Sequence, residues 1–330
     1  MTLLRVKNLR THFSTPTGFV RAVDGVSLSL EEGQILGIVG ESGSGKSVTA
    51  LSLMQLLPEN ATVCEADELS FDGSNILSFT KKQLREMRSR RIAMVFQDPM
   101  RSLNPVLTIG RQLTETLTLH MGLSKPAARK RAIELLERVG ISRAEKRLDE
   151  YPHQFSGGMR QRVMIAIALS CNPRLLIADE ATTALDVTIQ AQIVDLVKDI
   201  QRDFGMAVIW ISHDLGLVAG LCDQVAVMYA GRIVESGTVR DVFYRPSHGY
   251  TIGLMQCTPR VDDIGRALRP IEGMPPNLSE HMTLCPFLPR CQVAVSSCRS
   301  VMPCDKQVSP THTAACFGDL KPYWREKLET

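Results

Sequence analysis

Long apolar runs are missing from this chain of 330 residues. The longest candidate, residues 163–171, falls well short of the roughly 20 apolar residues that a membrane-spanning helix needs. A secretory signal peptide is not visible either, because Arg5 and Lys7 interrupt the apolar residues at the N-terminus. These absences predict a soluble or peripheral protein of the cytosol rather than an integral membrane protein.

Aromatic residues and excess charge are also scarce. Two tryptophans and five tyrosines offer little surface on which bases could stack, and the formal net charge is only +3. Neither feature favours a nucleic-acid partner. The composition is otherwise that of an ordinary globular protein, 44% hydrophobic and 22% charged, and the chain is long enough to bury a substantial core.

Apolar patterning predicts alternating strands and helices. Residues 34–39 are typical of a buried strand that runs directly into a glycine-rich loop, and residues 46–57 are typical of the helix that follows. Residues 175–179 and 208–211 predict two further core strands, with a helix over 190–200 between them. This order favours an α/β fold.

Other segments suggest additions to that core. Residues 3–6 and 26–30 have the apolar spacing of half-buried strands. Residues 126–140 are amphipathic, with Pro126 suited to the first helical turn and Gly140 to the end, which suggests a helical insert. Prolines recur and periodicity fades beyond about residue 250, which predicts a C-terminal extension.

The loop Gly40–Ser47 (GESGSGKS) matches the Walker A pattern. Its glycines let successive backbone N–H groups turn toward phosphate oxygens, and the following helix adds the positive end of its dipole. Lys46 would neutralise the β- and γ-phosphates, and Ser47 would ligate Mg²⁺. The flanking strand and helix favour this interpretation over a plain glycine-rich turn. The candidate nucleotide contacts are Gly40, Ser42, Gly43, Gly45, Lys46, Ser47 and Val48.

Residues 175–180 (LLIADE) resemble a Walker B strand, in which four apolar residues deliver two carboxylates to an exposed tip. Asp179 would hold Mg²⁺, and Glu180 would polarise the attacking water as general base. The pattern is weak alone, since buried strands often end in an acid. Its position after the Walker A loop strengthens the prediction.

Residues 155–162 (FSGGMRQR) resemble the signature sequence of ATP-binding-cassette (ABC) proteins, most often written LSGGQ. The resemblance covers roughly residues 3–250 and implies a RecA-like P-loop core with an antiparallel β subdomain and a helical insert at about 98–165. It implies that Ser156, Gly157 and Gly158 contact the γ-phosphate held by an opposite subunit. A simple helix N-cap would explain only the serine. Phe155 and Met159 depart from the usual leucine and glutamine.

Four more positions fit the family pattern in order. Gln97 resembles the Q-loop residue, which senses Mg²⁺ and water and couples to a membrane partner. Asp186, in residues 183–186, resembles the D-loop, and His213 resembles the switch histidine that contacts the γ-phosphate. Phe13 is the candidate for stacking on adenine, with a core role as the rival interpretation.

Three stretches, residues 96–105, 184–190 and 248–254, narrow the resemblance to the ATPase subunits of bacterial dipeptide, oligopeptide and nickel importers. This implies work at the cytoplasmic face of the inner (plasma) membrane as a peripheral subunit. The implied partners are two permease subunits, a second ATPase subunit, identical or homologous, and an external solute-binding protein. The domains would be residues 1–250, the nucleotide-binding domain, and 251–330, the cysteine-bearing extension.

Five of the nine cysteines crowd into the C-terminal stretch. By resemblance, Cys285, Cys291, Cys298 and Cys316 would hold a [4Fe–4S] cluster, with zinc as the alternative metal and Cys304 as a rival fourth ligand. Free thiols in a loosely folded tail are the other alternative.

The prediction is therefore an ATP- and Mg²⁺-dependent ATPase that powers an importer of peptides or related small solutes. The alternative is a soluble cassette ATPase that acts on nucleic acid or ribosomes. Such proteins commonly carry two cassettes or a long coiled-coil insert, and this chain shows neither.

Overall fold

The structure is a computed structural model that describes residues 1–16, 18–183, 185–258 and 269–324. Its backbone contacts divide the chain into two compact units. The Walker A unit comprises residues 2–30, 35–77 and 212–330, and the Walker B unit comprises residues 1, 31–34 and 78–211. Each unit contains strands, helices and part of the predicted nucleotide site.

The Walker A unit is rich in strands. These are β1 (Thr2–Thr15), β2 (Gly18–Glu31), β3 (Ile35–Val39), β4 (Ala61–Glu65), β5 (Glu68–Phe71), β6 (Ser74–Asn75), β10 (Gln224–Tyr229), β11 (Arg232–Thr238), β12 (Lys306–Ser309) and β13 (His312–Ala314). Its helices are α1 (Lys46–Leu53), α9 (Leu215–Leu221), α10 (Val239–Tyr244) and α11 (Gly249–Cys257). Single 3₁₀ turns are η1 (Ile76–Ser78), η3 (Leu288–Arg290), η4 (Ser296–Arg299) and η5 (Lys321–Tyr323).

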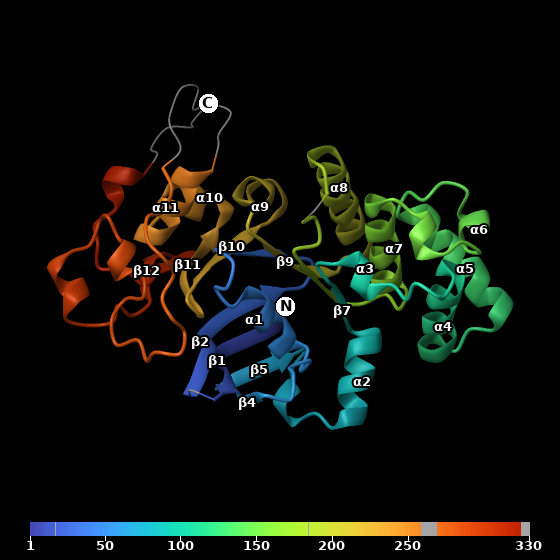
Figure 1. Ribbon diagram of the computed structural model, residues 1–330, viewed down its shortest axis with the longest axis horizontal. Coiled ribbons are helices and arrows are strands. Elements are labelled where there is room, and N and C mark those ends of the chain that lie inside the picture. The colour runs from blue at the N-terminus through green and yellow to red at the C-terminus, as the bar shows by residue number, and fades with distance from the viewer. Residues whose placement is uncertain (17, 184, 259–268, 325–330) are drawn as a thin grey trace. The chain divides into compact units, whose positions relative to one another are not determined.

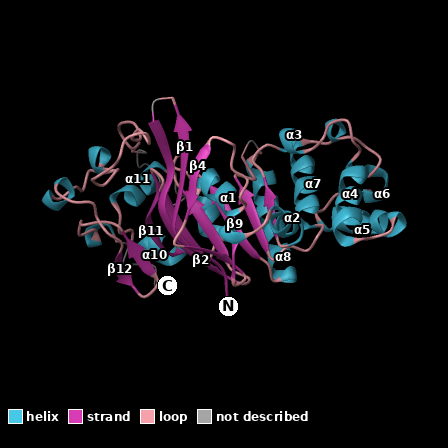
Figure 2. Ribbon diagram, turned by 90° about the horizontal axis from the view of Figure 1, so that it is seen from below, coloured by secondary structure: helices cyan, strands magenta, loops and turns pink. Residues whose placement is uncertain are grey.

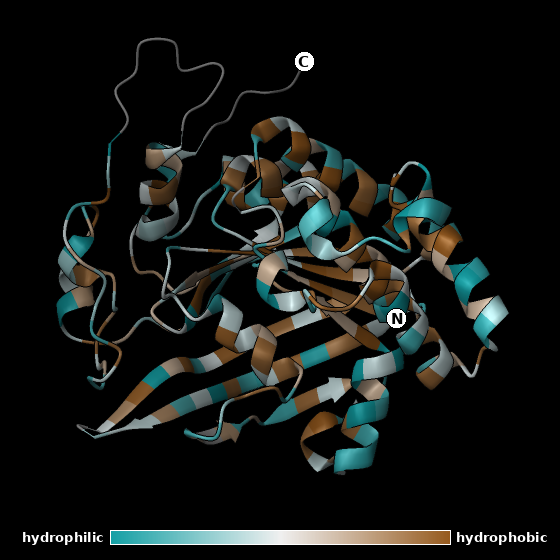
Figure 3. Cartoon of the chain, turned by 45° about the vertical axis from the view of Figure 1, so that its right-hand side comes forward, coloured by the Kyte–Doolittle hydropathy of each residue, from teal (hydrophilic) through white to brown (hydrophobic). Residues whose placement is uncertain are grey.

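An antiparallel sheet occupies the N-terminal part of this unit, with strand order β2-β1-β5-β6 and with β4 also paired to β1 (Figure 2). Apolar and polar residues alternate along its long strands (Figure 3). The buried set includes Leu4 and Phe71, which lie opposite each other in the register of β1 and β5. The period of two therefore gives this sheet one face for the core.

The second set of strands in this unit runs in the order β12-β13-β11-β10-β3. β10 is parallel to β3 and antiparallel to β11. All five residues of β3 are buried, and the strand leads into the loop that precedes α1 (Figure 1). A fully buried parallel strand explains why residues 35–39 form a continuous apolar run.

The Walker B unit combines three parallel strands with most of the long helices. The strands are β7 (Ile92–Val95), β8 (Leu175–Asp179) and β9 (Ala207–Ser212). The helices are α2 (Lys81–Arg90), α3 (Pro99–Ser102), α4 (Ile109–Met121), α5 (Lys125–Arg138), α6 (Ala144–Arg147), α7 (Gly157–Leu169) and α8 (Val187–Phe204), with the 3₁₀ turn η2 (Pro152–Gln154). β8 lies between β7 and β9, and α4, α5, α6 and α7 gather in one group (Figure 1).

Local capping explains where several of these helices begin and end. The Thr108 hydroxyl accepts a hydrogen bond from the backbone N–H of Arg111 at the start of α4. The helix predicted over 126–140 is α5, which ends at Arg138 and is followed by Gly140 at φ 77°. That left-handed conformation favours glycine and ends the helix.

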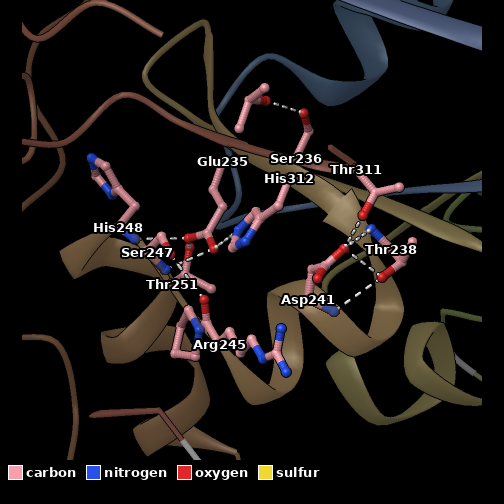
Figure 4. Close-up of polar contacts among 12 residues, drawn as sticks. Glu235, Ser236, Thr238, Asp241, Arg245, Ser247, His248, Thr251, Thr311 and His312 are labelled. Atoms are coloured by element: carbon pink, nitrogen blue, oxygen red, sulfur yellow. Dashed lines mark hydrogen bonds and ion pairs between the residues drawn. The ribbon is translucent and has the colours of Figure 1, made fainter. Parts of the chain in front are cut away.

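The C-terminal residues dock on the β11 edge of the Walker A unit, where Ser236 pairs with Thr313 across β11 and β13. Beneath this edge the Glu235 carboxylate is fully buried and accepts four hydrogen bonds (Figure 4). The donors are His312 Nε2 at 2.8 Å, the N–H of Ser247 at 2.8 Å, the N–H of His248 at 2.9 Å and Thr251 Oγ1 at 2.6 Å. Burial raises the pKa of Glu235, and the bonds from His312 and Thr251 act in the opposite direction.

A Glu235→Ala variant is expected to lose about 3–5 kcal/mol of unfolding free energy, because removal of one partner leaves buried polar groups unsatisfied. Urea unfolding followed by near-ultraviolet circular dichroism measures the loss. Glu280→Ala, at an exposed carboxylate in the same C-terminal region, is the control and should change stability little. Equal stability of the two variants would refute a structural role for the Glu235 network.

Within the described residues, none of the helices combines the length and the apolar character that crossing a bilayer requires.

Candidate nucleotide site

Two glycines let the Walker A loop fold as a tight turn. Gly45 has φ 107°, which L side chains rarely adopt, and a Cβ there would collide with the carbonyl oxygen of Ala22. A Cβ on Gly40 would collide with the carbonyl oxygen of Met228. The loop thus closes directly against its neighbours, and its backbone can approach a phosphate group without hindrance from side chains.

Lys46 lies at the start of α1 and is only 4% exposed. Its Nζ donates to the carbonyl oxygens of Gly40 at 2.8 Å and Glu41 at 2.9 Å. The ammonium group therefore spans the loop and is held at the N-terminus of a helix, where an anion is also favoured. A polyphosphate fits this cradle of glycines, helix terminus and lysine.

The other Walker A candidates lie in the same loop and on the same helix. Ser42 and Gly43 are exposed at the tip, Ser47 is exposed in the first turn of α1, and Val48 is half-buried beside it. Phe13 is half-buried in β1, at a register shift opposite Ala61 of β4. Its predicted role in adenine stacking stays a prediction.

In the Walker B unit, β8 ends at Asp179, and Glu180 follows it directly. Asp179 is buried at the end of the strand. Glu180 has φ 48°, an uncommon conformation for a residue other than glycine, and its N–H donates to the carbonyl oxygen of Ile211 at 3.0 Å. Such strain persists where surrounding structure fixes it, and it is frequent at functional sites.

Two side chains orient the Glu180 carboxylate. Gln97 Nε2 donates to Glu180 Oε2 at 2.8 Å, and Thr183 Oγ1 donates to the same oxygen at 3.2 Å. The structure thus joins Gln97 and Glu180, which the sequence suggested separately. Sequence reasoning missed Thr183 as a partner, although its spacing of three residues beyond Glu180 at a strand end was the available indication. These two donors fix the orientation of the carboxylate, as the position of a general base requires.

The signature residues begin α7. Ser156 is its N-cap, and its hydroxyl accepts from the N–H of Met159 at 3.4 Å. A Cβ on Gly158 would come within 2.7 Å of Ile189 in α8, so the glycine allows close helix packing. Phe155 is buried beneath the guanidinium of Arg147, at 5.6 Å from the ring centroid. The phenylalanine in place of leucine is therefore a core residue.

The remaining candidates also lie at element boundaries. Asp186 caps α8 by accepting from the N–H of Ile189 at 2.9 Å, and Gly157 starts α7. His213 is exposed between the end of β9 and Asp214, the N-cap of α9. Residue 184 of the predicted D-loop lies outside the described residues, as do residues 259–268 and 325–330 of the predicted extension.

The structure contradicts the predicted [4Fe–4S] or zinc site in the C-terminal stretch. Within residues 269–324 and the rest of the described chain, no three His, Cys, Asp or Glu side chains form a group that could hold a metal ion. Burial raises the pKa of Cys285 to about 11 and raises the pKa of Cys291 and Cys316. Burial in apolar surroundings disfavours the charged thiolate, the form of cysteine that ligates a metal.

Cys298 and Cys304, the other two cysteines of that prediction, do not complete a metal site among the described residues either. Cys298 is buried, Cys304 is exposed, and all nine cysteines are free. A tail of this size cannot build a large core of its own. Instead it is stabilised by strand pairing on β11, by the Glu235 network and by rings packed around Phe287.

Comparison with family models supports the cassette assignment. The model described as ABC transporter matches residues 23–183, and the model described as Oligopeptide/dipeptide transporter, C-terminal region, matches residues 234–298. The oligopeptide transport ATP-binding protein OppD of Salmonella typhimurium is 51% identical over 97% of this chain and 94% of its own length. The dipeptide transport ATP-binding protein DppD of Bacillus subtilis is 50% identical over 96% and 94%.

Solved structures agree with these relatives. A dimeric ATP-binding cassette in a post-hydrolysis state, bound to ADP and phosphate, superimposes with a TM-score of 0.64 at 28% identity, over 72% of this chain and 99% of that one. CbiO1 of Clostridium perfringens, part of the ABC transporter complex cbiONQ, gives a TM-score of 0.63 at 29% identity, over 74% and 91%. The fold is that of an ABC cassette with mixed α/β sheets.

Proposed function

This chain belongs to the ATP-binding proteins of ABC transporters, and from that premise we propose that it powers an importer of oligopeptides or dipeptides. The match of residues 234–298 to the oligopeptide/dipeptide C-terminal region is the observation that supports peptides as the transported solute. Those residues include α11 and most of β11, the strand on which β13 docks.

The chain is an ATPase, and its residues receive the following proposed roles. Lys46 neutralises the phosphates, and Glu180 accepts the proton of the attacking water. His213 contacts the γ-phosphate. Ser47, Gln97 and Asp179 supply hydroxyl, amide and carboxylate oxygens, the ligand types that Mg²⁺ prefers.

The proposed assembly contains two ATPase subunits and two permeases. The Walker A loop of one ATPase closes on Ser156, Gly157 and Gly158 of the other, with Asp186 near the interface between the two ATPase subunits. The second ATPase is an identical copy or a homologue. The permeases couple to the loop around Gln97 and receive solute from an external binding protein, so that the chain works at the cytoplasmic face of the inner membrane.

We also propose domain boundaries for the chain. Residues 1–250 form the nucleotide-binding domain, with an antiparallel β subdomain and a helical insert at about 98–165, and residues 251–330 form the C-terminal extension. The group of α4, α5, α6 and α7 supports the insert. The antiparallel sheet of β1, β2, β4, β5 and β6 supports the β subdomain.

Uptake by a reconstituted complex tests the proposal. Proteoliposomes that contain the chain with its co-purified permeases and binding protein are expected to accumulate a labelled tripeptide or dipeptide only when ATP is enclosed. Accumulation of another solute class with none of peptide would overturn the solute assignment and leave the ATPase assignment intact. The alternative of an ATPase acting on nucleic acid or ribosomes has no support among the relatives.

A further inference from the structure

Arg290 is a buried cation that reaches the Walker A loop from the C-terminal extension. Its side chain is 5% exposed and makes a bidentate ion pair with Glu41, the second residue of the loop. Nη1 donates to Glu41 Oε2 at 2.7 Å, and Nη2 donates to Oε1 at 2.9 Å. Two parallel charge-assisted bonds at such distances are among the strongest side-chain contacts in proteins.

The remaining donors of Arg290 are also used. Nε donates to the carbonyl oxygen of Glu272 at 3.1 Å, Nη2 to that of Ile271 at 3.3 Å, and Nη1 to the hydroxyl of Tyr229 at 3.2 Å. The guanidinium therefore has a fixed position, set by the extension and by β10. The carboxylate of Glu41 is held at that position.

The backbone of Glu41 is held by the same part of the chain. Its N–H donates to the hydroxyl of Tyr250 in α11 at 2.7 Å. Tyr250 is fully buried against Tyr229 and Phe287, with ring centroids 4.4 Å and 5.3 Å away. The Glu41 carbonyl accepts from Lys46 at 2.9 Å, so all three polar groups of Glu41 are bound.

A carboxylate in a phosphate-binding loop needs a counter-charge. The loop attracts anions through its N–H groups and Lys46, whereas an uncompensated Glu41 side chain would repel the same phosphates. We propose that Arg290 is a positioning residue of the ATP site, which neutralises and holds Glu41 and thereby sets the affinity for ATP. The C-terminal extension is thus a working part of the nucleotide site. The inference concerns ATP binding alone and does not depend on which solute is carried.

Nucleotide titration of the full-length chain in its complex tests this role. Arg290→Ala is expected to raise the Kd and KM for ATP about tenfold at low ionic strength while kcat at saturating ATP changes little. The deficit should shrink in high salt, because partly exposed charges are screened. Arg299→Ala, at an exposed arginine of η4, is the matched control and should bind ATP as the wild type does.

Second variants separate neutralisation from a merely structural contact. Adding Glu41→Gln to Arg290→Ala is expected to restore ATP affinity, and Glu41→Gln alone should bind ATP at least as tightly as wild type. Arg290→Lys keeps the charge and should retain most of the affinity even if Arg290→Ala folds poorly. Wild-type affinity in Arg290→Ala, or no recovery with Glu41→Gln, would overturn the proposal.

Discussion

A Glu180→Gln variant is expected to bind ATP like the wild-type chain and to hydrolyse it at least about 100-fold more slowly. The substitution keeps the shape of the side chain but removes the group that takes a proton from water. The amide oxygen can still accept from Gln97 and Thr183, which lie 2.8 and 3.2 Å from the carboxylate oxygen. Phosphate release measures hydrolysis, and titration with a fluorescent ATP analogue measures binding.

Two further variants, Gln97→Ala and Glu137→Gln, test whether the effect is specific to Glu180. Gln97→Ala removes only one donor to the carboxylate and should reduce hydrolysis less than Glu180→Gln does, by about tenfold, the effect of one hydrogen bond to a charged group. An exposed carboxylate of α5, Glu137, provides the control variant Glu137→Gln, which should leave hydrolysis unchanged. Hydrolysis at the normal rate by Glu180→Gln would remove Glu180 from its proposed role.

Local patterns were enough to predict the elements that carry the site. β3 and β8 are five-residue strands in which every position is buried, and each leads into a predicted motif. The ends of helices were less predictable. The helix expected over 46–57 stops at Leu53, because Gln55 adopts a left-handed φ of 51° before Pro58. The strands expected at 3–6 and 26–30 belong to much longer strands, β1 and β2.

Contacts between distant residues could not be predicted in this way. Arg290 and Glu41 are 249 residues apart, and neither stands out in its local sequence. The cysteine spacing suggested a metal site, but spacing does not report how the side chains pack, and among the described residues no group of three His, Cys, Asp or Glu could hold a metal ion. Both outcomes depend on how the extension packs on β10, β11 and α11, which is a property of the tertiary fold.

A Lys46→Ala variant is expected to lose ATP binding by about 100-fold or more while it stays folded. Lys46 is 4% exposed, and its ammonium group spans the loop between the carbonyl oxygens of Gly40 and Glu41. Its removal takes away the nearest positive charge for the phosphates and also the bonds that close the loop. Lys81→Ala, at an exposed lysine of α2, is the surface control. Lys46→Arg should not restore binding, because the larger planar group does not fit a buried site built for an ammonium.

The losses of ATP affinity in Lys46→Ala and Arg290→Ala should respond differently to a second substitution at Glu41 and to salt. Lys46 holds Glu41 through its backbone carbonyl, whereas Arg290 holds it through its carboxylate. Adding Glu41→Gln should therefore restore ATP affinity to Arg290→Ala and leave Lys46→Ala defective. The Lys46→Ala defect should also persist in high salt, since that charge is buried while the Glu41 side chain is 27% exposed. ATP titrations of the two alanine variants, each with and without Glu41→Gln, at two salt concentrations test this difference. Rescue of Lys46→Ala by Glu41→Gln would show that the lysine acts only by offsetting the Glu41 carboxylate.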